Sequence, residues 1–162
     1  MKKIIKLYIF NLSYRVVCLH RISFDLINKQ KYFSVILGKL IKTKIAKHYS
    51  VELNPINKIG YGLILPHPYN IIVGYGSTIG KNATLYNGVT LGAKNMLKFD
   101  KNKILENRYP TIENNVIVFS GAKLIGNIKI GKNSIIGANS VVLSSFNENS
   151  VIIGIPAKNL KK

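Results

Sequence analysis

The sequence predicts a mainly β protein: a left-handed parallel β-helix over residues 51–162, preceded by a short α-helical region over residues 1–50 and interrupted by a protruding loop at about residues 95–109. Two observations on periodicity support this. Aliphatic residues recur every six positions in the second region, whereas apolar residues in the first recur at spacings of three and four. The change of period near residue 50 therefore predicts a basic helical region followed by a repeat domain.

Residues 1–50 have the spacing of amphipathic helices, with lysines and arginines between the apolar positions and a break around residues 28–30. The apolar positions are Ile5, Tyr8, Ile9, Leu12, Phe33, Ile36, Leu37, Leu40 and Ile41. Two interpretations of these faces stay open. They pack on the rest of the protein, or they attach peripherally to an anionic membrane surface, as basic amphipathic helices can do.

From residue 73 the chain reads in blocks of six: VGYGST, IGKNAT, LYNGVT, LGAK, and after an interruption IENNVI, VFSGAK, LIGNIK, IGKNSI, IGANSV. The second place is often Gly. The aliphatic first places are Val73, Ile79, Leu85, Leu91, Ile112, Val118, Leu124, Ile130, Ile136 and Val142. The small or aliphatic fifth places are Ala83, Val89, Val116, Ala122, Ile128, Ser134 and Ser140.

This spacing predicts a short strand and a tight corner in every block, with the aliphatic residue pointing inward. Three such sides close a triangular coil of roughly 18 residues, and coils stack through parallel β hydrogen bonds. Gly and Asn are frequent near the corners, where a positive φ or a side chain that bonds its own backbone is often needed. No helix-length segment separates the strands, so an ordinary βαβ sheet is excluded. An antiparallel sandwich fits the strict spacing poorly.

Two segments depart from the repeat. Ile59 and Leu65 are out of phase with Val73 by two residues, which predicts an irregularity around Pro66–Asn70. The second departure is the polar, basic loop of residues 95–109. Long loops without structure of their own in a compact domain are usually functional or disordered, so both departures are candidate sites.

The composition limits the partners. The chain has 24 Lys and Arg against 6 Asp and Glu, a formal charge of +18, which favours polyanions or reflects composition bias and surface solvation. It contains no recognisable nucleic-acid-binding module, so we expect no nucleic-acid partner. No stretch reaches the length of a membrane span, and we interpret the N-terminus as mature sequence. Cys18 is the single cysteine, which suits a reducing, cytoplasmic compartment.

Three histidines are the candidates for acid–base chemistry. His20 and His48 lie in the basic helical region and are expected at the surface or in packing contacts. His67 is different because it lies in the out-of-phase segment of the repeat. A zinc enzyme on this fold needs several histidines around the metal, and the repeat region has only His67, so no metal site is expected.

A family resemblance gives these residues roles. The stretch VELNPINKIGYGLILPHPYNIIVGYGSTIG, followed in order by LYNGVTLGA, YPTI, SGAKLIGNIKIG, SIIGANSVV and GIPAK, resembles the serine acetyltransferase branch of the hexapeptide-repeat acyltransferases. The similarity covers about Val51 to Lys158. It implies a homotrimer with active sites between neighbouring β-helices, in which acetyl-CoA gives its acetyl group directly to an acceptor hydroxyl.

Within that resemblance, His67 matches the general base and Glu52 matches the carboxylate that orients it. The two are 15 positions apart, close to one coil, so stacking is expected to bring them together. An imidazole can accept the proton of a hydroxyl as it attacks, and a carboxylate behind the ring fixes its tautomer. A backbone N–H near Gly92 is expected to stabilise the oxyanion, a contribution of about 3 kcal/mol in comparable sites. The cofactor positions implied by the resemblance are Gly92, Ala93, Gly121, Ala122 and Ala138 along the pantetheine arm and Lys158 near the CoA phosphates.

The departures from the family pattern concern the acceptor. Serine acetyltransferases carry an aspartate before the catalytic histidine, where this chain has Pro66, and an Arg-His pair where it has Arg108 and Tyr109 as candidate substrate-binding residues. The helical N-terminal region is also shorter. These differences predict a saccharide acceptor, such as a unit of a capsular, O-antigen or related surface glycan. Serine O-acetylation with an altered acceptor site and a non-enzymatic binding β-helix are the alternatives.

Overall fold

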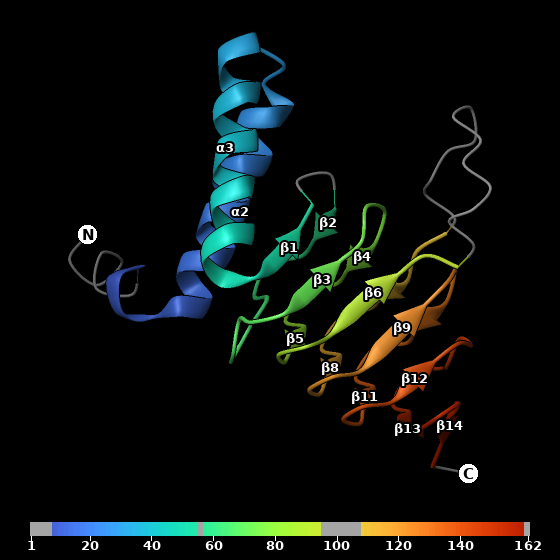
Figure 1. Cartoon of the computed structure of the whole chain (residues 1–162). Coiled ribbons are helices and arrows are strands. Elements are labelled where there is room, and N and C mark those ends of the chain that lie inside the picture. Colours follow the sequence, from blue (N-terminus) through green and yellow to red (C-terminus); the bar gives the residue numbers. More distant parts are fainter. Residues whose placement is uncertain (1–7, 55–56, 95–107, 161–162) are drawn as a thin grey trace.

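The structure is a computed structural model that describes residues 8–54, 57–94 and 108–160. Two antiparallel helices, α2 (Leu12–Asn28) and α3 (Tyr32–Tyr49), stand at one end of a stack of short strands (Figure 1). The strands are β1 (Val51–Leu53), β2 (Lys58–Ile59), β3 (Ile71–Val73), β4 (Thr78–Ile79), β5 (Thr84–Leu85), β6 (Thr90–Gly92), β7 (Thr111–Ile112), β8 (Ile117–Val118), β9 (Lys123–Ile125), β10 (Lys129–Ile130), β11 (Ile135–Ile136), β12 (Val141–Val142), β13 (Val151–Gly154) and β14 (Ala157–Asn159).

The strands form three sheets, one for each side of the coil. We call them sheet A (β1-β3-β6-β9-β12), sheet B (β2-β4-β7-β10) and sheet C (β5-β8-β11-β13-β14). The pairs are parallel except β13 with β14, which is antiparallel. From β1 to β13, successive strands of the chain belong to different sheets, so the chain winds around a common interior. This parallel coil with its hexapeptide repeat is consistent with the predicted left-handed β-helix, and the predicted helices precede it.

The interior confirms the six-residue frame. All ten predicted first places are at most 1% exposed, and all seven predicted fifth places are at most 5% exposed. Apart from Ser134 and Ser140, which are buried polar residues, they form one continuous apolar cluster that also includes Val16 of α2 and Ile45 of α3. Burial of a large aliphatic side chain contributes roughly 1.5–3 kcal/mol, so the inward column supplies most of the driving force for stacking.

Strand register locates the two irregularities. Leu53 pairs with Val73, 20 positions on, whereas Val73 pairs with Leu91, 18 positions on. The first coil is therefore two residues longer, and the extra length lies in the Pro66–Asn70 corner, as predicted. Ile79 pairs with Ile112, 33 positions on, because the predicted loop lies in that coil. Residues 95–107 of this loop fall outside the described part of the chain.

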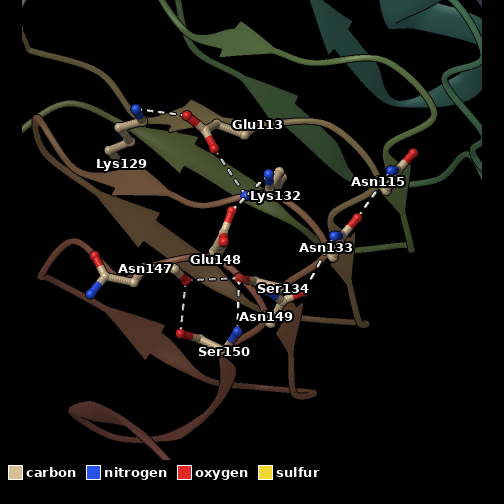
Figure 2. Close-up of polar contacts among 10 residues, drawn as sticks. All are labelled: Glu113, Asn115, Lys129, Lys132, Asn133, Ser134, Asn147, Glu148, Asn149 and Ser150. Atoms are coloured by element: carbon tan, nitrogen blue, oxygen red, sulfur yellow. Dashed lines mark hydrogen bonds and ion pairs between the residues drawn. The ribbon is translucent and has the colours of Figure 1, made fainter.

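An asparagine ladder joins the coils at one corner. The Asn82 amide donates to Asn115 (3.3 Å), Asn115 to Asn133 (3.0 Å) and Asn133 to Asn149 (3.2 Å), and all four residues have positive φ. Figure 2 shows the part of the ladder from Asn115 to Asn149. A short polar side chain makes this conformation tolerable and then bonds the coil below it. The prediction that corner asparagines serve both the φ angle and a local hydrogen bond is thus refined: the bond runs between coils.

Ion pairs tie the last coils together nearby. Lys129 Nζ lies 2.6 Å from the Glu113 carboxylate, and Lys132 Nζ lies 2.9 Å from that of Glu148 (Figure 2). The hydrogen bond from Lys129, then that from the Lys132 backbone, holds the pKa of the Glu113 carboxyl below its ordinary value. These pairs are exposed, so they fix geometry more than they add stability.

The glycines at the second place of the repeat have a different cause from the one expected. Gly80 and Gly131 are not among the residues with positive φ. A Cβ on Gly131 would lie 2.3 Å from the Glu148 backbone nitrogen, and one on Gly80 would lie 2.5 Å from the Glu113 carbonyl carbon. These positions need glycine because the next coil passes too close for any side chain.

Helix α2 covers the first coil and completes its backbone hydrogen bonds. Ser13 Oγ accepts from the Leu65 N–H (2.8 Å), and the Arg21 guanidinium donates to the carbonyls of Ile59 (3.4 Å) and Gly60 (2.7 Å). His20 is 3% exposed beside Arg21. Burial, then the neighbouring Arg21 charge, lowers the pKa of His20 to about 4, against a backbone hydrogen bond at Leu53. The His20 side chain is therefore neutral near pH 7.

Helix α3 departs from the predicted packing face. Phe33 is 79% exposed and Leu40 is 60% exposed, whereas Gly38 and Ile45 are buried. The reason is a close contact between the helices: Ser23 Oγ donates to the Gly38 carbonyl (2.8 Å), where a Cβ would meet Ile27 at 2.7 Å. On this face Ile41 packs against the core, as the first of the two interpretations expects. Phe33, Ile36, Leu37 and Leu40 instead point to solvent. No helix in the described ranges is both long and apolar enough to cross a membrane.

Replacing Gly131 by Ala should destabilise the stack by about 1–3 kcal/mol, because the new Cβ collides with the backbone of the next coil. Urea unfolding at pH 7 measures the change. Gly137→Ala is the matched control, since its Cβ would meet a movable Ile153 side-chain atom at 2.7 Å. Equal losses in the two variants would contradict the explanation.

The free energy of unfolding should fall as the pH drops from about 6.5 towards 4, because the unfolded chain protonates His20 before the folded chain does. The neutral His20 destabilises the fold least above this pH window, and the free energy of unfolding falls by about 3 kcal/mol across the window. His20→Gln should flatten this part of the profile. His48→Gln, at an exposed histidine of α3, should leave it unchanged. Parallel slopes for both variants would show that other groups carry the dependence.

Candidate active site

His67 lies in the lengthened corner between Leu65, which is fully buried, and β3. Pro66 and Pro68 flank it, and the Tyr69 N–H donates to the His67 carbonyl oxygen (2.8 Å). Each proline fixes its own φ and restricts the residue before it, so the backbone around the histidine has few alternatives. The His67 side chain is exposed. The longer corner thus presents an accessible imidazole on a restrained loop.

Two aromatic rings continue from His67 along the same corner. The Tyr86 ring lies 6.4 Å from the imidazole centroid, tilted by 51°, and stacks on Phe119 at 5.1 Å. The Tyr86 N–H donates to Val118 O (3.0 Å), which places the two rings on successive coils. Tyr86 is half-buried and Phe119 is 37% exposed. The result is an aromatic platform, Tyr86 and Phe119, beside the candidate base.

Glu52 does not stack on His67. It is exposed on the outer face of β1, and the register pairs it with Ile72, five residues beyond the histidine. Across the described residues the structure gives no hydrogen bond or ion pair between the two side chains. Because the first coil has 20 residues, the strand register places Glu52 beside Ile72 and His67 in the corner before that strand. The orienting role of Glu52 stays a prediction.

Three of the predicted cofactor residues lie at the corner that holds His67. Gly121 has a φ of 74°, and its N–H donates to Asn87 O (2.9 Å). Ala138 is exposed one coil further on. Ala122 is fully buried, with its methyl group in the core, so only its backbone is available to a ligand. Gly121, which is half-buried, and Ala138, which is exposed, thus lie at the surface on the corner that also holds the aromatic platform.

The remaining predicted residues lie elsewhere. Gly92 ends β6 and Ala93 follows it, at the opposite edge of sheet A. Tyr109 is 8% exposed and its ring lies where a Gly74 Cβ would be, 2.4 Å from that position, at this second edge. Arg108 next to it is half-buried. Lys158 is exposed on β14, opposite Ile153 in sheet C.

One chain therefore brings most of the predicted residues to the two edges of sheet A and does not unite them, while Lys158 lies in sheet C. His67, Gly121 and Ala138 occupy the edge where the chain enters sheet A, and Gly92, Ala93 and Tyr109 occupy the edge where it leaves. Glu52 is on the face between these edges. Nothing among the described residues groups three or more His, Cys, Asp or Glu side chains in a way that could hold a metal ion.

Sequence reasoning missed three residues of this face. Tyr86 and Phe119 occupy the second place of their blocks, where Gly is common. Two aromatic residues at this place are the signal in the sequence that indicates a special corner. Lys123 on β9 points outward from sheet A, and its Nζ donates to Gly88 O (2.5 Å). It pairs with Thr90, in the same outward row as Glu52 and Ile72. Its position depends on register, which the repeat alone does not assign to a face.

Comparison with known proteins agrees with this architecture. The sequence pattern described as bacterial transferase hexapeptide (six repeats) matches residues 109–144. A serine acetyltransferase of Staphylococcus aureus is 39% identical over 144 residues, which cover 88% of this chain and 62% of that protein. A serine acetyltransferase of Buchnera aphidicola is 36% identical over 122 residues, covering 75% of this chain and 42% of that protein. The chain thus spans less than two thirds of the length of these curated relatives.

Solved structures give the same result. The serine acetyltransferase of Neisseria gonorrhoeae in complex with serine superimposes with a TM-score of 0.82 at 28% identity, covering 96% of this chain and 60% of that one. A serine acetyltransferase in complex with CoA has a TM-score of 0.80 at 30% identity, with coverage of 95% and 60%. The likeness extends over both the helices and the coil.

Proposed function

We propose that this chain, which belongs to the bacterial hexapeptide-repeat transferases, transfers an acetyl group from acetyl-CoA to a hydroxyl. The observation that carries the proposal is His67, an exposed imidazole on a restrained corner that is two residues longer than the repeat requires. A stacked coil has no structural need for these extra residues. Their presence beside a basic side chain supports a catalytic corner.

In the proposed reaction, His67 accepts the proton of the acceptor hydroxyl as its oxygen attacks the thioester carbonyl carbon. The carbon–sulfur bond then breaks, and the CoA thiolate takes the proton back from the imidazolium. Gly92 is proposed to donate its backbone N–H to the developing oxyanion. Glu52 is proposed to orient the imidazole, a role that requires its exposed side chain to reach the corner from β1.

The cofactor residues keep their proposed roles with one restriction. Gly92, Ala93 and Gly121 are half-buried and Ala138 is exposed, and we propose that these surface positions line the pantetheine arm. Ala122 is fully buried and can support the arm only through its backbone. Lys158 is proposed to meet the CoA phosphates. The named complex of a related serine acetyltransferase with CoA supports acetyl-CoA as the donor.

A homotrimer would unite the two edges of sheet A. Within one chain, His67 and Gly92 lie at opposite edges of that sheet, and the family resemblance implies active sites between neighbouring β-helices. We propose that the entry edge of one subunit faces the exit edge of the next. This arrangement would place the base of one chain near the cofactor backbone of its neighbour.

L-serine is the first acceptor that we propose. The relatives from Staphylococcus aureus and Buchnera aphidicola are serine acetyltransferases, and one solved relative is named as a complex with serine, so the comparisons favour this alternative over the saccharide predicted from the sequence. Arg108, half-buried beside the exit edge, is a candidate partner for the serine carboxylate.

A saccharide is the second candidate because three residues of this chain favour it. Pro66 replaces the aspartate that the resemblance places before the base, and Tyr109 is buried against Gly74, where it offers little to a small zwitterion. The exposed face of Phe119 can pack against the apolar face of a sugar ring. A site built to bind serine would lose much of its affinity without the aspartate and the histidine that Pro66 and Tyr109 replace in the family pattern.

The cellular location belongs to the same proposal. We place the protein on the cytoplasmic side, where acetyl-CoA is available. A position at the inner face of the membrane is proposed because the helices are basic and expose apolar side chains.

His67→Ala should lower kcat/KM for acetyl transfer by roughly 10²- to 10⁴-fold, because the general base is lost. CoA release from acetyl-CoA measures it with L-serine and, in parallel, with a panel of saccharides. His48→Ala, at an exposed histidine in the last turn of α3, is the control and should retain full activity. Unchanged transfer in the His67 variant would refute the mechanism. Faster release with one acceptor class decides between the two candidates.

Phe119→Ala should raise KM for a saccharide acceptor several-fold and leave KM for acetyl-CoA unchanged, if the aromatic platform holds the sugar ring. Phe119→Tyr keeps the ring and should restore the saccharide KM. With L-serine as the acceptor, Phe119→Ala should have the same KM as the unmodified protein. An equal rise in KM for both acceptors would show that the stack only supports the corner.

A further inference from the structure

The tip of the α2–α3 hairpin exposes large apolar side chains that no residue of the described ranges covers. Tyr32 is 84% exposed and Phe33 is 79% exposed, immediately after the turn between the helices. Figure 1 shows this turn at the end of the hairpin that lies far from the strands. Single exposed apolar residues need no explanation, but two adjacent aromatic rings at the end of a projecting element do.

The exposed apolar surface continues down one side of α3. Ile36 is 39% exposed, Leu37 is 42% exposed and Leu40 is 60% exposed. With Phe33 they recur at spacings of three and four, so they share one side of the helix. That side turns away from α2, which packs against Gly38. The apolar surface is therefore a stripe that starts at the tip and runs along the outer half of α3.

Positive charge surrounds this stripe. Lys29 and Lys31 flank the turn, and residues 12–49 contain one acidic residue, Asp25. The basic residues of the hairpin are Arg15, Arg21, Lys29, Lys31, Lys39, Lys42, Lys44 and Lys47. Lysine side chains next to apolar groups can extend their ammonium groups to lipid phosphates while the apolar groups enter the interface.

We propose that the hairpin tip, residues 29–40, binds the surface of an anionic lipid bilayer. Aromatic rings favour the headgroup boundary, and each lysine near an anionic surface adds electrostatic attraction. A second copy of the chain fits less well. Its own hairpin carries the same excess of positive charge, so symmetric pairing through this stripe would bring like charges together. The inference concerns the helices alone and stands independently of the proposed acetyl transfer.

The absence of tryptophan from the sequence allows a direct test with the full chain. Phe33→Trp places the single indole at the tip. Its fluorescence should shift to the blue on addition of vesicles of phosphatidylcholine and phosphatidylglycerol, and lipids brominated on the acyl chain should quench it. Ile155→Trp, 73% exposed at the other end of the molecule, is the control and should not respond. An unchanged spectrum for the tip variant would overturn the proposal.

The charge requirement has a matched comparison. Lys29→Gln with Lys31→Gln should weaken co-sedimentation with the same vesicles roughly tenfold or more. Lys58→Gln with Lys81→Gln removes equal charge from exposed positions on the coil and should have a smaller effect. Equal weakening would show attraction by net charge alone and would overturn a tip-specific site, as would full binding to pure phosphatidylcholine.

A protein partner gives a different result. Tyr32→Ser with Phe33→Ser should abolish vesicle binding and leave the sedimentation coefficient in the absence of lipid unchanged. A smaller assembly in this variant would identify the stripe as a contact between copies of the chain and would overturn the membrane assignment. Both residues are exposed, so the variant keeps the fold.

Discussion

In this chain, the backbone hydrogen bonds of each coil are completed by the coil above it and the coil below it. Each of the two end coils lacks one neighbour, so the backbone groups on its outer side need other hydrogen-bond partners or cover. At the first coil, Ser13 and Arg21 of α2 meet the unpaired N–H of Leu65 and the carbonyls of Ile59 and Gly60. At the last coil, β14 folds back antiparallel on β13. An unprotected sheet edge invites association, and both ends are covered.

The same constraint decides where the chain can vary. Strands must keep their register, and the inward aliphatic column must stay continuous, so additional residues fit only at corners. Both insertions obey this rule, and both border sheet A: the Pro66–Asn70 corner precedes β3, and the loop beginning near residue 95 follows β6. Sheet A is consequently the side of the coil on which chemistry can be built. The candidate base and the candidate cofactor backbone lie at its two edges for this reason.

Much of the fold is predictable because one interaction repeats. The inward positions, the long corner and the break between the helices all follow from spacing, and Val73 or Leu124 identifies its neighbours by counting in sixes. The spacing does not determine where side chains point at the corners or how far apart corner residues lie. Whether Glu52 reaches His67 depends on the two extra residues of the first coil, and the outward face of α3 depends on a contact at Gly38. Tyr86 and Phe119 become neighbours only when the coils stack.

The identity of the acceptor shows how differently scaffold and site respond to sequence change. Similarity over 144 residues is dominated by positions that maintain the coil, and these are the same for any acceptor. Selectivity depends on a few corner residues, whose replacement hardly alters overall identity. Pro66, Tyr109 and Phe119 are three such residues, and all three reduce the polar character of the site. The relatives' names therefore support mainly the scaffold and the proposed donor, whereas these corner residues bear on the proposed acceptor. L-serine and a saccharide are thus both physically compatible with the same coil.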